Sequence, residues 1–244
     1  MPAASSPSSA CEPQRWTLSG GEASAGAPRT AANLGDAAAG LTVGGGVRVL
    51  GVAVPAGCQP TEAWTRGADL TAIYEPGDDR GLRITAMWRL GEEEPARAGV
   101  SSWQLVLSAQ TSLLATAAEL TVLADVANAG TITTGRWRGT AVDWEADPHG
   151  IARCVRLCPS GAASGECLVI AIHPDDSGVV ECSPTQAGGV EIRCRLFPSS
   201  VEKGVLLRSR VLAALGPLAS ADDGADWSAT MLEQFAGSEP ILTA

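Results

Sequence analysis

Residues Val190–Leu196, with the sequence VEIRCRL, alternate strictly between apolar and charged side chains, and Cys194 falls on the apolar side. Successive side chains of a β-strand point to opposite faces, so this pattern predicts a strand with one face in a core and the other in solvent. Leu82–Leu90 shows a similar alternation. These stretches decide the fold class, because strands of this kind are stable only when their apolar faces pack together.

A turn sequence separates two of the extended runs. The segment Glu75–Asp79 contains Pro-Gly-Asp, which is typical of tight turns, and it lies between Glu62–Tyr74 and Leu82–Leu90. This arrangement predicts an antiparallel hairpin. Within Glu62–Tyr74 we expect Gly67 to mark a β-bulge in one long strand.

Further short extended runs follow along the chain. Together with those above they make roughly ten or more strands, at a spacing of roughly 8–15 residues and without regular intervening helices. The sequence therefore predicts a mainly β fold, a large antiparallel β-sandwich, with a barrel as the alternative. One helix is expected at the C-terminal end. Trp227, Met231 and Phe235 recur at helical spacing there, and Gly237 is available as a stop.

The domain organisation follows from composition. Residues 1–40 are rich in Ala, Ser, Gly and Pro, so we expect a flexible tail that buries too little surface to offset ordering. Residues 41–215 are expected to form the sandwich domain. Residues 216–244 are expected to form a C-terminal helical tail packed on it.

Net charge excludes some partners. The formal charge is −10 and the pI about 4.7, whereas nucleic acids and anionic membranes attract basic surfaces. The longest apolar region, residues 111–130, is interrupted by Glu119 and Asp125, so no membrane span is expected. The first residues lack the features of a secretory signal, which predicts a cytoplasmic protein if the chain is complete.

Cysteines and acidic residues give no metal-site pattern. Seven cysteines, an odd number without an export signal, argue against a full disulfide framework, and the closest pair, Cys154 and Cys158, lacks a second close pair for zinc. The alternating carboxylates of Asp143–His149 lack a calcium-loop pattern and are typical of a solvated strand edge. The glycine clusters do not match a phosphate-binding loop. We therefore expect neither a metal nor a cofactor.

His173 is the candidate catalytic residue. It follows an apolar strand, where loop residues often build sites, and Asp175 lies two residues further on. A histidine held by a carboxylate can act as an acid or a base, and Glu202 is a second candidate partner. The alternative is ordinary turn chemistry, since Pro-Asp-Asp-Ser-Gly follows the histidine.

Tryptophan is unusually frequent, with seven Trp against two Phe and one Tyr. Three of them lie in apolar strands and are expected in the core: Trp64, Trp88 and Trp103. Trp137 and Trp144 lie on a more polar segment beside Arg136 and Arg138. These four residues are the candidate surface platform for a ligand such as a sugar, on whose faces exposed Trp can stack.

Three segments, residues 172–176, 196–208 and 238–243, resemble uncharacterised bacterial proteins of a planctomycete type, a resemblance that implies no activity. In layout the chain is also similar to the large β-sandwich of galactose-mutarotase-like proteins. The paired catalytic histidines of that family are not evident in this sequence. Their absence counts against aldose epimerase activity.

Three functions remain after these exclusions. The first is a non-catalytic binding or interaction module, with a carbohydrate or a protein as its partner. The second is a carbohydrate-active enzyme that uses His173 with a nearby carboxylate. The third is a purely structural subunit. At least one of Trp137 and Trp144 exposed beside a concave surface would favour the first, and His173 in a cleft with a carboxylate within hydrogen-bond reach would favour the second. An isolated His173 with both of these Trp buried would favour the third.

Overall fold

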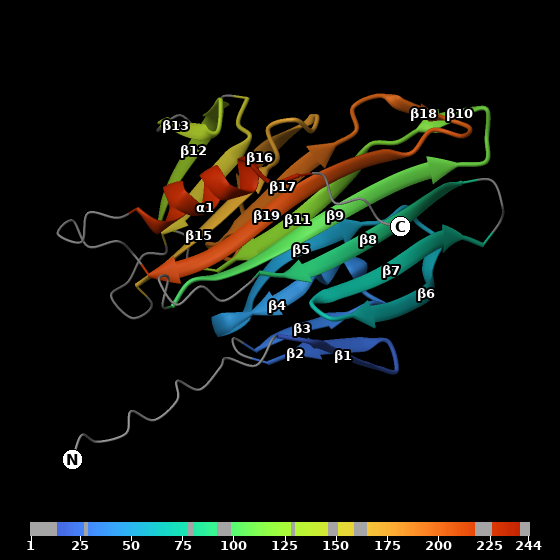
Figure 1. Ribbon diagram of the computed structural model, residues 1–244, viewed down its shortest axis with the longest axis horizontal. Coiled ribbons are helices and arrows are strands. Elements are labelled where there is room, and N and C mark those ends of the chain that lie inside the picture. The colour runs from blue at the N-terminus through green and yellow to red at the C-terminus, as the bar shows by residue number, and fades with distance from the viewer. Residues whose placement is uncertain are drawn as a thin grey trace, which may run out of the picture.

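Two large antiparallel sheets lie face to face in the computed structural model, and one α-helix packs on the outside of one of them (Figure 1). The structure describes residues 14–26, 29–77, 81–91, 99–127, 130–145, 151–158, 165–217 and 226–239. The predicted mainly β fold, an antiparallel sandwich with a C-terminal helix, is confirmed.

The first sheet has eight strands. In spatial order they are β1 (Trp16–Ser19), β2 (Glu22–Ala25), β3 (Thr30–Asn33), β4 (Leu41–Val43), β5 (Val47–Ala53), β11 (Leu120–Val126), β17 (Val190–Leu196) and β16 (Gly178–Pro184). Two 3₁₀ turns, η1 (Ala37–Ala39) and η2 (Gly44–Gly46), flank β4.

The second sheet has nine strands. In spatial order they are β13 (Ala141–Glu145), β12 (Thr131–Arg138), β14 (Cys154–Cys158), β15 (Glu166–Ile172), β19 (Leu207–Pro217), β9 (Ser101–Thr111), β8 (Leu82–Leu90), β7 (Asp69–Pro76) and β6 (Cys58–Arg66). A separate pair, β10 (Ala115–Ala117) with β18 (Ser200–Glu202), completes the described strands.

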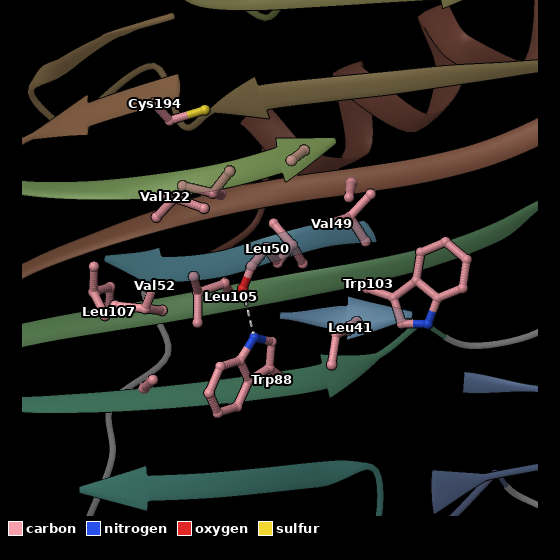
Figure 2. Packing of buried hydrophobic residues seen from close by; sticks show 14 of the residues in the cluster. Leu41, Val49, Leu50, Val52, Trp88, Trp103, Leu105, Leu107, Val122 and Cys194 are labelled. Carbon is pink, nitrogen blue, oxygen red and sulfur yellow. Dashed lines mark hydrogen bonds between the residues drawn. The ribbon is translucent and has the colours of Figure 1, made fainter. Parts of the chain in front are cut away.

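The core lies between the two sheets (Figure 2). Leu41 and Val52 from the first sheet face Trp103 and Leu105 from the second, and all four are buried. The alternation that predicted β17 is confirmed, because its apolar residues are buried and the charged residues between them are not. Strand β15 is apolar at every position after Glu166, because both of its faces are covered there.

One face of β15 packs into the core between the sheets, and the helix α1 (Trp227–Ala236) packs on its other face. The Asp226 side chain caps its first turn by accepting a hydrogen bond from the Ser228 backbone N–H at 3.1 Å. Leu232 and Phe235 are buried against Val169 of β15 and its neighbours, a second and smaller apolar cluster. No helix in the described ranges combines the length and hydropathy that crossing a membrane requires.

Strands β1 to β3 occupy a region that the composition predicted to be a flexible tail. Within the described part of residues 1–40, small apolar residues such as Ala23 and Ala32 face the core, and Trp16 is buried at its edge. At residues 16–26 and 29–33 the structure has paired strands where a flexible tail was expected, because backbone pairing to neighbouring strands and one large anchor compensate for small side chains. Residues 1–13 lie outside the described ranges.

Gly67 forms a hairpin turn and not the expected bulge. Arg66 pairs with Asp69, so only Gly67 and Ala68 connect β6 to β7, and Gly67 has a φ of +60°. Glycine tolerates that conformation at the first central position of a two-residue hairpin turn. Trp16 also contacts the turn, since its backbone and indole N–H groups donate to the Gly67 and Ala68 carbonyls at 3.3 and 2.9 Å. The long predicted strand is therefore two strands, and β6 ends the sheet.

One disulfide is present among the described cysteines. Cys158 and Cys167 join the ends of β14 and β15, whose register makes them cross-strand neighbours. Cys154 and Cys194 are buried free thiols, and burial raises the pKa of each above its usual value. Their place in the core agrees with the expectation that Cys194 serves as a small apolar residue.

The Trp88 indole stabilises an irregular point in the opposite sheet. Its Nε1–H donates to the Leu50 carbonyl at 2.9 Å (Figure 2), where β5 bulges against β11 and Leu50 has a φ of +55°. We expect Trp88→Phe to lower the free energy of unfolding by about 1–3 kcal/mol, because the buried carbonyl loses its donor. Equilibrium urea unfolding measures this change.

Trp64→Phe is the matched control for that measurement. Trp64 is 44% exposed, and a substitution there should change the free energy of unfolding by no more than about 0.5 kcal/mol. Equal losses in the two variants would contradict the role given to the Trp88 hydrogen bond.

Candidate functional site

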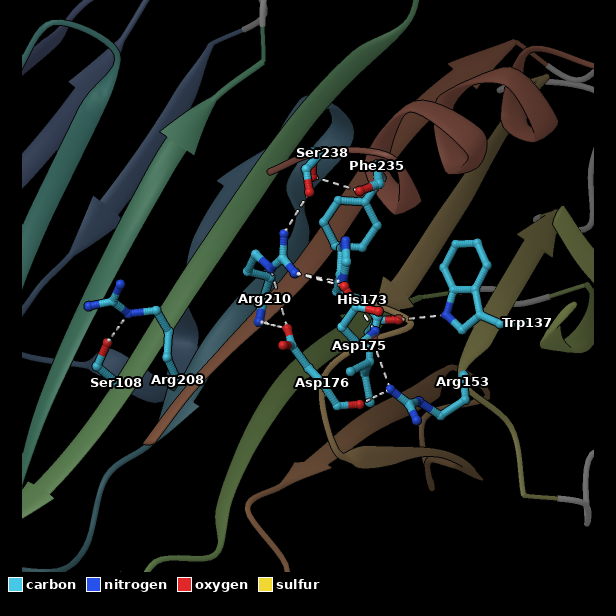
Figure 3. A network of polar contacts seen from close by, with 11 residues as sticks. Ser108, Trp137, Arg153, His173, Asp175, Asp176, Arg208, Arg210, Phe235 and Ser238 are labelled. Carbon is cyan, nitrogen blue, oxygen red and sulfur yellow. Dashed lines mark hydrogen bonds and ion pairs between the residues drawn. The ribbon is translucent and has the colours of Figure 1, made fainter. Parts of the chain in front are cut away.

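His173, the predicted catalytic residue, is fully buried with an exposed fraction of 0%. It follows β15, and its backbone N–H donates to the Arg210 carbonyl of β19 at 3.0 Å. Its ring packs edge-on against Phe235 of α1, with centroids 5.1 Å apart. The histidine therefore sits beneath the C-terminal end of the helix, in contact with protein on every side that the structure describes (Figure 3).

The ring nitrogens of His173 fix its protonation state. Nδ1 accepts from the Asp175 backbone N–H at 3.2 Å and lies 2.7 Å from Nη2 of Arg210. Arginine only donates, so Nδ1 carries a lone pair and the ring is neutral, with its proton on Nε2. Nε2 makes no hydrogen bond of normal geometry with a described residue.

Burial is the main cause that lowers the pKa of His173 below its usual value, and the Arg210 charge lowers it further. Asp176, Asp175 and the nearby Phe235 carbonyl act in the opposite direction without reversing the shift. A buried, neutral ring that faces an arginine is poorly placed to exchange protons with a substrate. The contacts favour a structural role for His173.

A group of polar residues surrounds Arg210, and we call it the Arg210 network. Its members are Arg153, His173, Asp175, Asp176, Arg210 and Ser238. Asp176 accepts from the Arg210 backbone N–H at 2.7 Å, and Nη1 of Arg210 donates to the Ser238 carbonyl at 3.0 Å. Arg153 donates to the His173 carbonyl at 2.8 Å and to the Asp176 carbonyl. The network thus ties the end of α1 to β19 and to the turn after β15.

The two carboxylates predicted as partners of His173 are placed differently. Asp175 Oδ2 lies 3.8 Å from Nδ1, and its side chain is 79% exposed. Glu202 is exposed on β18, which pairs with β10 and belongs to neither large sheet. The fold brings Asp175 to the histidine and places Glu202 on a separate pair of strands.

Trp137 and Trp144, the predicted platform, pack against the apolar cluster under α1 and are only partly exposed. Trp137 donates from Nε1 to the Ile172 carbonyl at 2.8 Å, and the Arg156 guanidinium lies 4.8 Å from the centre of the Trp144 ring. Arg136 and Arg138 are exposed, and Arg138 forms an ion pair with Asp143 at 2.6 Å. The indole faces are therefore partly occupied by the protein itself.

A different surface has the form of a binding site. A hollow of about 860 Å³ lies on the outer face of the nine-stranded sheet, over β6 to β9 and the start of β19. We call it the outer-face groove, and its aromatic and charged lining residues are Trp64, Arg66, Arg83, Arg89, Arg208 and Asp69. Ile73 and Met87 supply apolar atoms between them.

Strand register explains why these side chains converge. Trp64 pairs with Thr71, which pairs with Met87, so the three residues form a row across the sheet, with their side chains on one face. The adjacent row contains Arg66, Asp69 and Arg89, again as direct cross-strand neighbours. The floor of the groove thus consists of rows of cross-strand neighbours, and Trp64 lies on β6, the last strand of the sheet.

Most charges in the groove are held in fixed positions. Arg89 binds Asp69 through two hydrogen bonds of 2.6 and 2.8 Å, and Arg83 lies 3.0 Å from Glu75. Arg208 donates from Nε to the Ser108 hydroxyl at 3.3 Å (Figure 3). Paired side chains of this kind lose little further freedom on binding and present a preformed set of donors.

The sequence predicts Trp64 in the core, but the structure exposes it. The error follows from the turn at Gly67, because a bulge there would have kept Trp64 within one long strand, whereas the turn places it on the last strand of the sheet. A usable signal was present: Glu62, Trp64 and Arg66 alternate on one face with two charges among them. A strand face of that composition belongs in solvent.

No protein-family model matches this sequence, and no curated protein matches it. Several solved structures resemble it in fold. An Escherichia coli K12 protein provisionally named an aldose 1-epimerase has 9% identity and a TM-score of 0.44, over 64% of this chain and 68% of that one. The galactosidase domain of the α-galactosidase–sucrose kinase AgaSK has 10% identity and a TM-score of 0.38, over 70% of this chain.

An α-galactosidase from Lactobacillus brevis has 10% identity and a TM-score of 0.29, over 72% of this chain. The chain spans 28% of the length of each of the two galactosidase structures. The planctomycete resemblance finds no support in these comparisons. At such identities and scores the likeness assigns neither a family nor an activity.

The lowered pKa of His173 predicts how stability depends on pH. Above the unfolded-state pKa of about 6.5 the histidine is neutral in both states. As pH falls below that value the unfolded chain binds a proton that the folded protein resists, so the free energy of unfolding decreases until the pH reaches the lowered folded pKa. One proton contributes at most about 1.4 kcal/mol per pH unit.

Urea unfolding at several values between pH 7 and pH 5.5 measures this slope, above the range in which most carboxylates titrate. We expect His173→Gln to reduce the slope relative to the unchanged protein, whatever its effect at pH 7. Equal slopes in the two proteins would show that His173 is not a neutral, buried group.

Proposed function

We propose that this chain is a non-catalytic carbohydrate-binding module and that the outer-face groove is its binding site. The observation that carries the proposal is Trp64, a large aromatic side chain that is 44% exposed beside a preformed hollow lined by paired polar groups. Trp88 and Trp103, by contrast, are buried in the core.

The lining fits the two kinds of surface that a sugar presents. A pyranose ring has an apolar face of C–H groups, which can stack on an indole, and a rim of hydroxyls that donate and accept hydrogen bonds. Trp64 supplies the first contact, while Asp69, Arg89 and Gln110 supply the second. The volume of about 860 Å³ lies within the roughly 300–1,000 Å³ typical of ligand sites.

The same lining favours binding over catalysis. Glycoside hydrolysis uses two carboxyl groups, one of them free to donate a proton. Asp69 is the only carboxylate among the described residues that line the groove, and both of its oxygens are engaged by Arg89. His173 lies outside the groove, beneath α1.

A panel of neutral hexasaccharides of glucose, galactose, mannose and xylose tests the proposal by isothermal titration calorimetry. We expect at least one to bind, and we expect Trp64→Ala to weaken that binding at least tenfold, since a central Trp contact often dominates the affinity. Trp64→Phe, which keeps an aromatic face, should lose less.

Leu114→Ala is the matched surface control. Leu114 is the most exposed large apolar side chain described, and it does not line the groove. Its substitution should leave affinity unchanged. Binding that survives in Trp64→Ala would place the site elsewhere, and a structural subunit would be favoured if neither the neutral panel nor acidic oligosaccharides bound.

A further inference from the structure

We infer that the ligand of the outer-face groove is an acidic oligosaccharide, one whose sugar units carry carboxylate or sulfate groups. This inference rests on the proposed function and makes its ligand class specific. The supporting observations are the charge of the groove, the position of Arg66 and the continuation of the hollow along the sheet.

The groove is positive on a negative protein. The whole chain has a formal charge of −10, whereas the groove is lined by four arginines and one aspartate, a formal charge of +3 that becomes +2 when Glu75, the partner of Arg83, is included. A local excess of one sign in a hollow surface raises the concentration of ligands of the opposite sign. Neutral sugars would gain nothing from this distribution.

Two of the groove arginines form ion pairs with carboxylates of neighbouring strands, and Arg66 does not. Arg89 is neutralised by Asp69 and Arg83 by Glu75, so their charges contribute to cross-strand pairs. Arg66 is exposed and forms no ion pair or side-chain hydrogen bond with any described residue. Its guanidinium is therefore available to an anionic group of the ligand.

Arg66 stands next to the aromatic contact. It lies two residues from Trp64 on β6, so the two side chains share a face and their Cα atoms are about 7 Å apart along the strand. A sugar stacked on Trp64 would place its substituents within reach of the guanidinium. Arginine binds carboxylate and sulfate oxygens through paired hydrogen bonds, so both anions fit this position.

Arg208 stands across the groove on β19, the fifth strand from the sheet edge that β6 forms. Its Nε–H donates to the Ser108 hydroxyl, which holds the guanidinium against the sheet (Figure 3). Cationic side chains thus line the hollow at both of its sides. That separation suits a ligand with more than one anionic unit.

The hollow continues beyond the first site. A second one of about 480 Å³ shares Arg83 and Gln110 with it and extends past Glu75 to Thr111 and Ser112. An open, elongated surface with repeated donors matches a chain of sugar units better than a single sugar. The length of the groove and its charge therefore point to the same ligand class.

Titration calorimetry on the full chain, with matched pairs of oligosaccharides, tests this inference. One pair is oligogalacturonate and its methyl ester, which differ only in the carboxylate charge. The other is a carrageenan oligosaccharide and its desulfated form. We expect the acidic member of at least one pair to bind at least tenfold more tightly, and the preferred pair identifies the anion.

Three variants locate the charge that is responsible. Arg66→Gln and Arg208→Gln should each reduce the acidic preference about tenfold, as the loss of a charge-assisted hydrogen bond does. Arg48→Gln removes an exposed arginine from the other sheet, where it pairs with Asp125, and should change affinity less than twofold. Affinity of the unchanged protein should also fall with added salt, a result that needs no variant.

The outcomes separate this inference from the proposed function. If both members of each pair bind equally and Trp64→Ala still abolishes binding, the acidic ligand is overturned and the carbohydrate-binding function stands. An acidic preference that Arg66→Gln and Arg208→Gln both leave intact also overturns it, because the attraction then arises elsewhere. If no neutral or acidic oligosaccharide binds, both proposals fail.

Discussion

The size of α1 relative to the sheet beneath it is the constraint on which the rest of this structure depends. The helix has ten residues, so it is about 15 Å long and about 10 Å wide. Nine strands at a spacing of about 4.8 Å are about 38 Å across. One helix of this length covers only part of the outer face, and the described chain places no second helix there (Figure 1).

The two parts of that face differ accordingly in composition. Under α1 the strands carry apolar residues such as Val169 and Leu212, which exclude water with the helix. Over β6 to β9 the outward positions carry cross-strand ion pairs and one exposed Trp. Arg210 lies at the boundary, where its contacts with Asp176 and Ser238 hold the end of the helix in place. Binding chemistry is thus concentrated where packing leaves the sheet open.

Local patterns predicted elements whose side chains see one environment on each face. Strand β17 alternates because one face meets the core and the other meets solvent, and α1 repeats its large residues at helical spacing because one side packs on the sheet. Strands β1 to β3 lacked such a signal. Their small residues are stabilised by pairing partners, and Trp16 is anchored at the Gly67 turn, some fifty residues away in the sequence.

The candidate site also combines features that local patterns predicted with features that depend on long-range packing. The sequence by itself determined a mainly β fold of alternating strands, a C-terminal helix and a chain rich in Trp, because these follow from composition and from periods of two and 3.6 residues. The choice between a sandwich and a barrel needed the arrangement of the strands in space. Only the tertiary structure decided that His173 is buried and that Trp64 is exposed. Both outcomes depend on which neighbour covers the outer face of a strand: α1 packs on β15, and no described element packs on the outer face of β6. Local sequence does not encode such long-range cover.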